Sequence, residues 1–139
     1  MELLIIDAQG GGLGRQLVAA VKKAVPELTV TAVGTNSAAT GAMLKAGADQ
    51  AATGENAVVV GCRRADIIAG PIGLLIADSM LGEITPAMAE AVGRSGAVRV
   101  LIPMNLCDTY VAGTVKGSSA ILADAMEHIR QLTERKTDG

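Results

Sequence analysis

The sequence has almost no aromatic residues: its 139 positions include one tyrosine and no tryptophan or phenylalanine. Proteins that bind single-stranded nucleic acid stack the bases on aromatic side chains, so this lack argues against such a ligand. A basic surface is also missing, because the formal net charge is −2 and the isoelectric point is about 5.3. We therefore expect no nucleic-acid partner.

Long hydrophobic runs and paired cysteines are absent as well. The longest apolar stretch, residues 67–77, is too short to span a bilayer and contains a Gly-Pro dipeptide, so we expect no membrane partner. Met1 runs directly into a predicted strand, without the charged and apolar segments of a signal peptide. Cys62 and Cys107 are far apart and form no Cys-x-x-Cys pair, so we expect free thiols, a cytoplasmic location and no bound metal.

Apolar runs that suit buried strands alternate with amphipathic segments that suit helices. The predicted strands are residues 2–7, 28–33, 48–52, 66–69 and 98–102, with a possible sixth at 109–112. The predicted helices are residues 13–25, 37–46, 57–63, 74–81, 86–94 and 118–132. This alternation predicts a single α/β domain over residues 1–132, a doubly wound, mostly parallel, Rossmann-like sheet of five or six strands. Residues 133–139 are predicted to form a flexible C-terminal tail.

Half of the residues are hydrophobic, and the mean hydropathy of +0.40 is high for a small domain. A sheet covered by helices on both faces accounts for part of this apolar content. We expect the remainder to be buried between subunits of a homo-oligomer.

A glycine cluster follows the first predicted strand at once. Asp7 ends that strand, and four of residues 10–14 are glycine before a helical pattern begins. A strand, a glycine turn and a helix N-terminus together direct backbone N–H groups at an anion, so the loop predicts a phosphate or nucleotide site. The alternative is a tight turn that needs glycine for backbone reasons alone.

The loop does not match the standard phosphate-binding motifs. Arg15 stands where the third glycine of a Gly-x-Gly-x-x-Gly pattern starting at Gly10 would fall. The P-loop signature Gly-Lys-Ser/Thr is replaced by Gly-Arg-Gln at residues 14–16, which leaves no hydroxyl for magnesium. Hydrolysis of ATP by a P-loop mechanism is therefore disfavoured.

Small and polar residues recur at the ends of the predicted strands. Ligands of doubly wound sheets bind beyond the carboxyl ends of the strands, so these residues are predicted to meet at one cofactor site. The predicted cofactor-binding residues are Gln9, Gly10, Gly11, Gly12, Leu13, Gly14, Thr35, Asn36, Ser37, Thr53, Asn56, Gly70, Pro71, Ile72, Gly73 and Asn105.

The identity of the nucleotide is left open by the second strand. A protein that holds the ribose of NAD usually has an acid there, and residues 35–37 read Thr-Asn-Ser instead. These side chains suit a phosphate, as in NADP, and equally suit a helix cap. We therefore expect NAD(P) or another nucleotide.

Two acids are candidate catalytic groups. Asp7 ends the first predicted strand, Glu55 follows the third, and Glu83 is a further acid that could reach the cleft. For Asp7 the structural alternative is a strand-end acid that accepts hydrogen bonds from loop N–H groups. His128 lies far in sequence from every predicted loop and is given no catalytic role.

Five motifs carry a resemblance that covers nearly the whole chain. They are DAQGGGLG at residues 7–14, GTN at 34–36, ATGENA at 52–57, GPIG at 70–73 and SMLGEITP at 79–86. The sequence resembles a family of small bacterial proteins known only as a domain of unknown function, which implies a Rossmann-like fold and no particular activity. A weaker similarity is to methylglyoxal-synthase-like domains, carried by Gly34, Thr35 and Asn105. The Gly-Gly-Asp catalytic segment of those domains has no clear counterpart.

Three functions fit the sequence. The first is a nucleotide- or dinucleotide-binding protein whose phosphate is held by residues 10–14. The second is an enzyme that acts on a small phosphorylated metabolite with Asp7 or Glu55 as the acid or base. The third is a non-catalytic interaction module that forms a homo-oligomer through residues 74–81 and the last helix.

Overall fold

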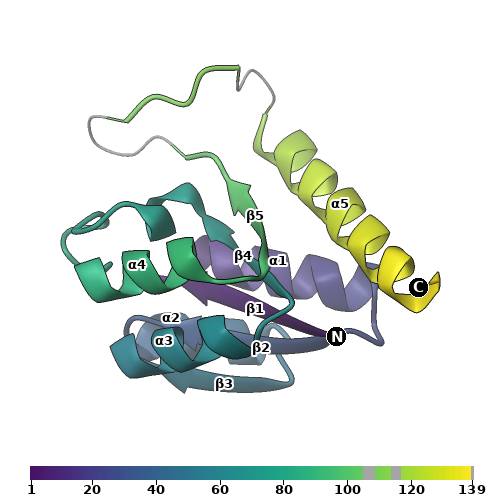
Figure 1. The fold of residues 1–139 in the computed structure, drawn as a ribbon, viewed down its shortest axis with the longest axis horizontal. Coiled ribbons are helices and arrows are strands. Elements are labelled where there is room, and N and C mark those ends of the chain that lie inside the picture. Colours follow the sequence, from purple (N-terminus) through teal and green to yellow (C-terminus); the bar gives the residue numbers. More distant parts are fainter. Residues whose placement is uncertain (105–108, 114–116, 139) are drawn as a thin grey trace.

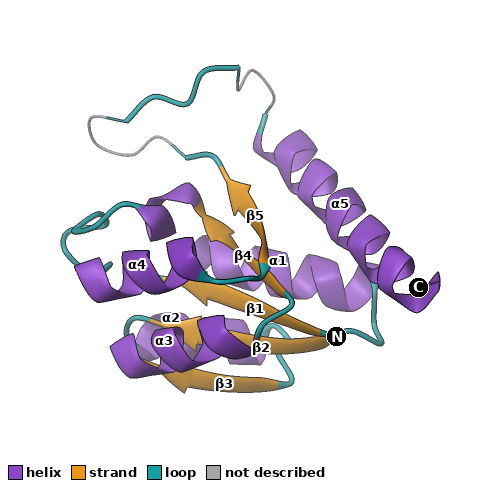
Figure 2. Cartoon of the chain, viewed as in Figure 1, coloured by secondary structure: helices purple, strands orange, loops and turns teal. Residues whose placement is uncertain are grey.

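The structure is a computed structural model that describes residues 1–104, 109–113 and 117–138. Strands and helices alternate along this part of the chain, as Figures 1 and 2 show. The elements are β1 (Glu2–Asp7), α1 (Gly12–Ala24), β2 (Thr29–Gly34), α2 (Ser37–Lys45), β3 (Gln50–Thr53), α3 (Glu55–Arg64), β4 (Ile67–Pro71), the 3-10 helix η1 (Ile72–Leu75), α4 (Pro86–Arg94), β5 (Val98–Ile102) and α5 (Ser118–Asp138).

The five strands form one parallel sheet in the order β3-β2-β1-β4-β5. The chain moves outward from β1 to β3 and then starts again at β4 on the other side of β1. The switch point of the sheet therefore lies between β1 and β4, where such folds bind their ligands. The register pairs Asp7 with Gly34 and Gly34 with Thr53, so these three strand ends are aligned along one edge.

Helices cover both faces of the sheet (Figure 1). Leu3 and Ile5 of β1 belong to a core shared with α1, α2 and α5, whereas Leu4 and Ile6 belong to a second core shared with α3, η1 and α4. This alternation buries β1 on both faces and explains why its sequence is continuously apolar. The prediction of a doubly wound, Rossmann-like α/β sheet is confirmed, with five strands.

The start of α4 follows from its sequence. The Thr85 hydroxyl accepts a hydrogen bond from the backbone N–H of Met88 at 3.2 Å, and Pro86 occupies the first helical position. A threonine cap followed by proline satisfies or removes the N–H groups that a helix start leaves unpaired. Within the described part of the chain, no helix is long and apolar enough to cross a membrane.

The helix predicted over residues 74–81 is wrong. The chain forms η1 and then a series of turns, in which Asp78, Met80 and Leu81 have left-handed backbone conformations with φ of 65°, 55° and 58°. The apolar composition of this segment suits a helix, but the chain instead uses it to build the loop above the switch point. We call residues 76–85 the switch loop.

Two predictions near the C-terminus also differ from the structure. Residues 109–112 contain a single bridge residue, Thr109, where a sixth strand was considered. Residues 133–138 continue α5 rather than forming a tail, and Lys136 in this last part pairs with Asp66 at 2.6 Å. This ion pair gives the end of the helix a contact that its sequence does not reveal.

Candidate ligand-binding site

Asp7 anchors the glycine loop after β1. Its side chain is 5% exposed, Oδ1 accepts the backbone N–H of Ala8 at 2.8 Å, and Oδ2 accepts that of Gly14 at 2.7 Å. Burial raises the pKa of this carboxyl above its usual value; the two backbone hydrogen bonds oppose that shift, and the charge of Glu83 adds to it. Both oxygens are therefore engaged in holding the loop against the start of α1.

The glycines of the loop divide into two pairs. A Cβ on Gly11 would lie 2.9 Å from backbone atoms of Ala39, and Gly11 has a φ of 72°. A Cβ on Gly14 would lie 2.5 Å from the Met43 sulfur and 2.8 Å from the Cβ of Asp7. Packing therefore explains both of these glycines.

Packing does not explain Gly10 and Gly12, because a Cβ on either would meet nothing within 4 Å. Neither residue has a left-handed φ, so the backbone does not require glycine there. Both residues are exposed. Their missing side chains leave the backbone open to a close approach from outside.

The same loop presents N–H groups without partners. Gly11 caps α1 without a side-chain hydrogen bond, and the N–H groups of Gly10, Gly12 and Leu13 have no hydrogen-bond acceptor among the described residues. The N-terminus of a 13-residue helix adds the positive end of its dipole. These groups can bind the oxygens of an anion such as phosphate.

A cavity of about 730 Å³ lies beside these N–H groups at the switch point. One wall is the glycine loop with Asp7, and the opposite wall is the switch loop. The lining residues are Asp7, Ala8, Gln9, Gly10, Gly11, Gly12, Leu13, Ile76, Ala77, Asp78, Ser79, Met80, Leu81, Met104 and Thr109. Among these described residues there is no lysine, arginine or histidine, so only backbone groups offer positive charge to a ligand.

Glu83 connects the switch loop to the ends of β1 and β2. Its Oε1 accepts hydrogen bonds from the Thr35 hydroxyl at 2.7 Å, the Asn36 amide at 2.7 Å and the Gln9 backbone N–H at 3.0 Å. The first of these bonds contributes most to lowering the pKa of Glu83, so the side chain is a carboxylate at neutral pH. Two predicted ligand contacts, Thr35 and Asn36, are thus bonded to an acid of the chain itself.

The remaining predicted residues are more dispersed. Glu55 is exposed and accepts a hydrogen bond from the Thr85 hydroxyl at 2.5 Å, and Thr53 bonds with Thr40 at 2.7 Å. Ser37 and Asn56 are exposed near the starts of α2 and α3. None of these predicted residues lines the cavity at the glycine loop.

Gly70 and Pro71 are the last residues of β4, Ile72 and Gly73 begin η1, and all four stay outside the cavity lining. A Cβ on Gly70 would lie 2.5 Å from the Ile6 carbonyl oxygen, so close packing explains this glycine. Asn105 and Cys107 lie outside the described residues, whereas Cys62 is a buried free thiol whose pKa burial raises to about 11.

Sequence reasoning missed the opposite wall of the cavity. The wall residues Ile76, Met80 and Leu81 fall in the segment whose apolar sequence predicts a helix. Glu83 was identified as an acid that could reach the cleft, but its three partners come from two other loops. The one local signal was Gly82, whose φ of 85° marks the turn.

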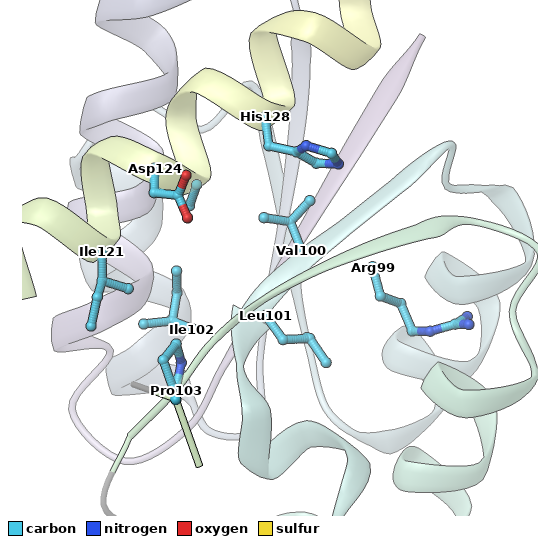
Figure 3. Close-up of a pocket in the computed structure, with 10 residues that line it drawn as sticks. Arg99, Val100, Leu101, Ile102, Pro103, Ile121, Asp124 and His128 are labelled. Carbon is cyan, nitrogen blue, oxygen red and sulfur yellow. The ribbon is translucent and has the colours of Figure 1, made fainter. Parts of the chain in front are cut away.

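A second hollow of about 440 Å³ lies between β5 and α5 (Figure 3). Val100 and Ile102 point toward α5, and Asp124 and His128 lie one turn apart on that helix. Arg99 points to the other face of the strand, where its Nη1 donates to the Ser95 carbonyl at 2.7 Å. This hollow shares no lining residue with the first and contains none of the residues predicted for the cofactor site.

The fold and the cavity define a Rossmann-like α/β protein with a glycine loop and an open cavity at the switch point of its sheet. Residues 2–135 match the family model of a domain of unknown function, DUF3842, and the chain belongs to that family. The resemblance drawn from the sequence motifs is thereby confirmed. The similarity to methylglyoxal-synthase-like domains stays a prediction.

Two further comparisons bear on the fold. No curated protein matches the sequence. The chain is similar to the crystal structure of a dodecameric FMN-dependent UbiX-like decarboxylase from Escherichia coli O157:H7, with 15% identity and a TM-score of 0.53. The match covers 96% of this chain and 95% of that one. At this identity the comparison supports the Rossmann-like fold and nothing further.

Proposed function

We propose that this protein binds a phosphate-bearing, nucleotide-type cofactor in the cavity at the switch point. The observation that carries the proposal is the pair Gly10 and Gly12, whose open faces and unpaired N–H groups adjoin that cavity. Packing and backbone conformation give no other reason for glycine at either position. The phosphate is held by the N–H groups of Gly10, Gly12 and Leu13.

The remainder of the cofactor lies against the switch loop. Ile76, Met80 and Leu81 supply an apolar wall, and Leu13 faces the same cavity from the start of α1. A cavity of this size and character suits a ring system attached to the phosphate. The similarity to an FMN-dependent enzyme makes flavin mononucleotide the first ligand to test.

The first experiment compares FMN with riboflavin, which has the same ring and lacks the phosphate. We expect FMN to bind at least about tenfold more tightly, because charge-assisted hydrogen bonds contribute about 1.5–3 kcal/mol each. Quenching of flavin fluorescence during titration measures both affinities. Equal binding of the two flavins, or binding of neither flavin and of no other nucleotide, contradicts the proposal.

The second experiment uses Gly12→Ala with Gly41→Ala as its matched control. Both glycines are exposed helix residues whose Cβ would meet nothing within 4 Å, so both variants should fold at least as stably as the native chain. Only Gly12→Ala places a methyl group on the phosphate-binding loop. We expect it to weaken FMN binding about tenfold or more while Gly41→Ala leaves it unchanged.

The catalytic alternative has less support from the geometry. Both oxygens of Asp7 accept backbone N–H groups, and Glu55 lies outside the cavity lining with Thr85 as its partner. Asp7 therefore has no oxygen without a hydrogen bond, and Glu55 does not line the cavity. An acid or base role for these residues therefore remains the second hypothesis.

We also infer a homo-oligomer in the cytoplasm. Large apolar side chains that flank or line the open cavity are exposed, among them Leu75, Leu81, Met104 and Tyr110. A second copy of the chain that covers them would close the cavity from solvent. Light scattering on the purified protein tests this, and a monomer at all concentrations overturns it.

A further inference from the structure

The inference concerns the class of ligand and rests on the proposed function. The cavity beside the glycine loop is lined by Gln9 and by residues 76–81 of the switch loop. Thr35 and Asn36 follow β2, and neither of them lines it. The carboxylate of Glu83 lies between these two side chains and Gln9 and accepts a hydrogen bond from each of the three residues.

This position matters because of how doubly wound sheets bind dinucleotides. One nucleotide lies on each side of the switch point, and the first ribose is held at the end of β2. In this chain the polar donors at the end of β2 are already bonded to Glu83. A ribose or a further phosphate placed at the end of β2 would have to displace a carboxylate that three donors hold in place.

The negative charge of the site also disfavours a ligand with more than one phosphate. The described lining contains Asp7 and Asp78 but no basic side chain, and Glu83 adds a further negative charge beside Gln9. The free N–H groups of the glycine loop are sufficient for one phosphate.

We propose that Glu83 restricts the cavity to a mononucleotide with a single phosphate and an uncharged ring. The phosphate lies on the glycine loop, the ring lies against Met80 and Leu81, and Glu83 occupies the place of a second nucleotide. NAD(P) and FAD are excluded by this arrangement, and so is ATP. Glu83 is therefore a specificity-determining residue rather than a ligand contact.

The test compares each mononucleotide with a dinucleotide that contains it: FMN with FAD, and AMP with NAD. For each pair that the native protein binds, we expect the mononucleotide to bind at least about tenfold more tightly than the dinucleotide. Calorimetric titration measures the four affinities. Equal affinity for a mononucleotide and its dinucleotide overturns the inference and leaves the proposed phosphate site in place, whereas binding of none of the four and of no other nucleotide overturns both.

Glu83→Gln gives the second arm, because the amide oxygen retains an acceptor for Thr35 and the negative charge is lost. We expect the preference for the mononucleotide to fall about tenfold, through tighter binding of the dinucleotide. Glu90→Gln, an exposed carboxylate on α4, is the control and should leave the preference unchanged. Circular dichroism confirms that the variants fold.

Two results of the Glu83→Gln experiment overturn the inference. An unchanged preference means that Glu83 does not influence ligand choice. Weaker binding of the dinucleotide means that the carboxylate holds a ribose hydroxyl, as the acid at the end of β2 does in NAD-binding proteins.

Discussion

Asp7 illustrates how one buried residue shapes the candidate site. Its carboxylate lies at the end of the central strand and accepts two N–H groups that border the glycine loop. Because these two groups are occupied, the N–H groups left for a ligand are those of Gly10, Gly12 and Leu13. Asp7 thus determines which N–H groups of the loop are left for a ligand, although it offers no free oxygen of its own.

Replacing Asp7 by asparagine should lower the free energy of unfolding by about 1–3 kcal/mol at neutral pH. The amide can accept one of the two N–H groups but leaves the other buried donor without an acceptor. Chemical denaturation monitored by circular dichroism measures the loss. A variant as stable as the native protein would mean that these hydrogen bonds contribute little.

The difference in unfolding free energy between the native protein and Asp7→Asn should also depend on pH. Burial raises the folded-state pKa of Asp7 above its usual value of 3.8, so the folded state binds the proton more tightly than the unfolded state does. The contribution of Asp7 to stability is then full below pH 3.8 and falls as the pH rises through the folded-state pKa. The unfolding free energy of the native protein minus that of Asp7→Asn should shrink toward neutral pH. If it grows instead, the loop hydrogen bonds outweigh the burial of the charge.

Among the helices and strands, the switch loop differs most from its sequence-based prediction. β5 was predicted at its observed bounds, and the cap of α4 was identified from Thr85 and Pro86, because these signals are local. Apart from Gly82, the switch loop carries no such signal, since left-handed residues such as Met80 and Leu81 are rarely apolar. Its shape depends instead on contacts such as that between Asp78 N–H and the Ile84 carbonyl at 2.7 Å.

Leu81 should show that the switch loop is strained. Its φ is 58° and it is 95% exposed, so its side chain contributes little packing to offset a left-handed backbone. The left-handed conformation costs about 1–2 kcal/mol for a residue with a Cβ and little for glycine. Leu81→Gly should therefore raise the unfolding free energy by about 0.5–1 kcal/mol, as measured in urea.

Leu44→Gly is the control for this experiment. Leu44 is 51% exposed in the last turn of α2, where the backbone is still helical and glycine lowers helix stability by up to about 1 kcal/mol. The two variants remove the same side chain and should shift stability in opposite directions. Destabilisation by both would mean that the loop of Leu81 stores no backbone strain.

At the scale of the whole molecule, the sequence predicted the fold but resolved only part of the site. The alternation of elements places all five strand ends at one edge, which is why the sequence alone predicts that the glycine loop lies at that edge. The distinction between Gly12 and Gly14 depends on Met43, which is brought close by the packing of α1 against α2. The contact between Glu83 and Thr35 likewise joins residues 48 positions apart, and no local pattern reveals it.

The C-terminal helix provides another long-range contact. Lys136 Nζ lies 2.6 Å from Asp66 Oδ1, and the other oxygen of Asp66 accepts the backbone N–H of Glu2 at 2.7 Å. These bonds join the end of the chain to the beginnings of β1 and β4, at the edge of the sheet opposite the cavity. Both side chains are partly exposed, so Lys136→Ala should cost only about 0.2–1 kcal/mol, and less at high salt.

Titration of Asp66 distinguishes this ion pair from a general effect of losing a lysine. The hydrogen bond from Lys136 is the largest cause of the lowered pKa of Asp66, so the stabilisation is present above the usual pKa of 3.8 and is lost as the pH falls through the folded-state value. Lys45→Ala, also in the last turn of a helix, serves as the control because no ion pair joins Lys45 to a described carboxylate. Denaturant titrations at neutral and acidic pH measure the unfolding free energies. Those of Lys136→Ala and the native protein should become equal at acidic pH, while the effect of Lys45→Ala on the unfolding free energy stays constant. Equal effects of the two variants at neutral pH would mean that α5 is held only by its apolar contacts with α1 and β5.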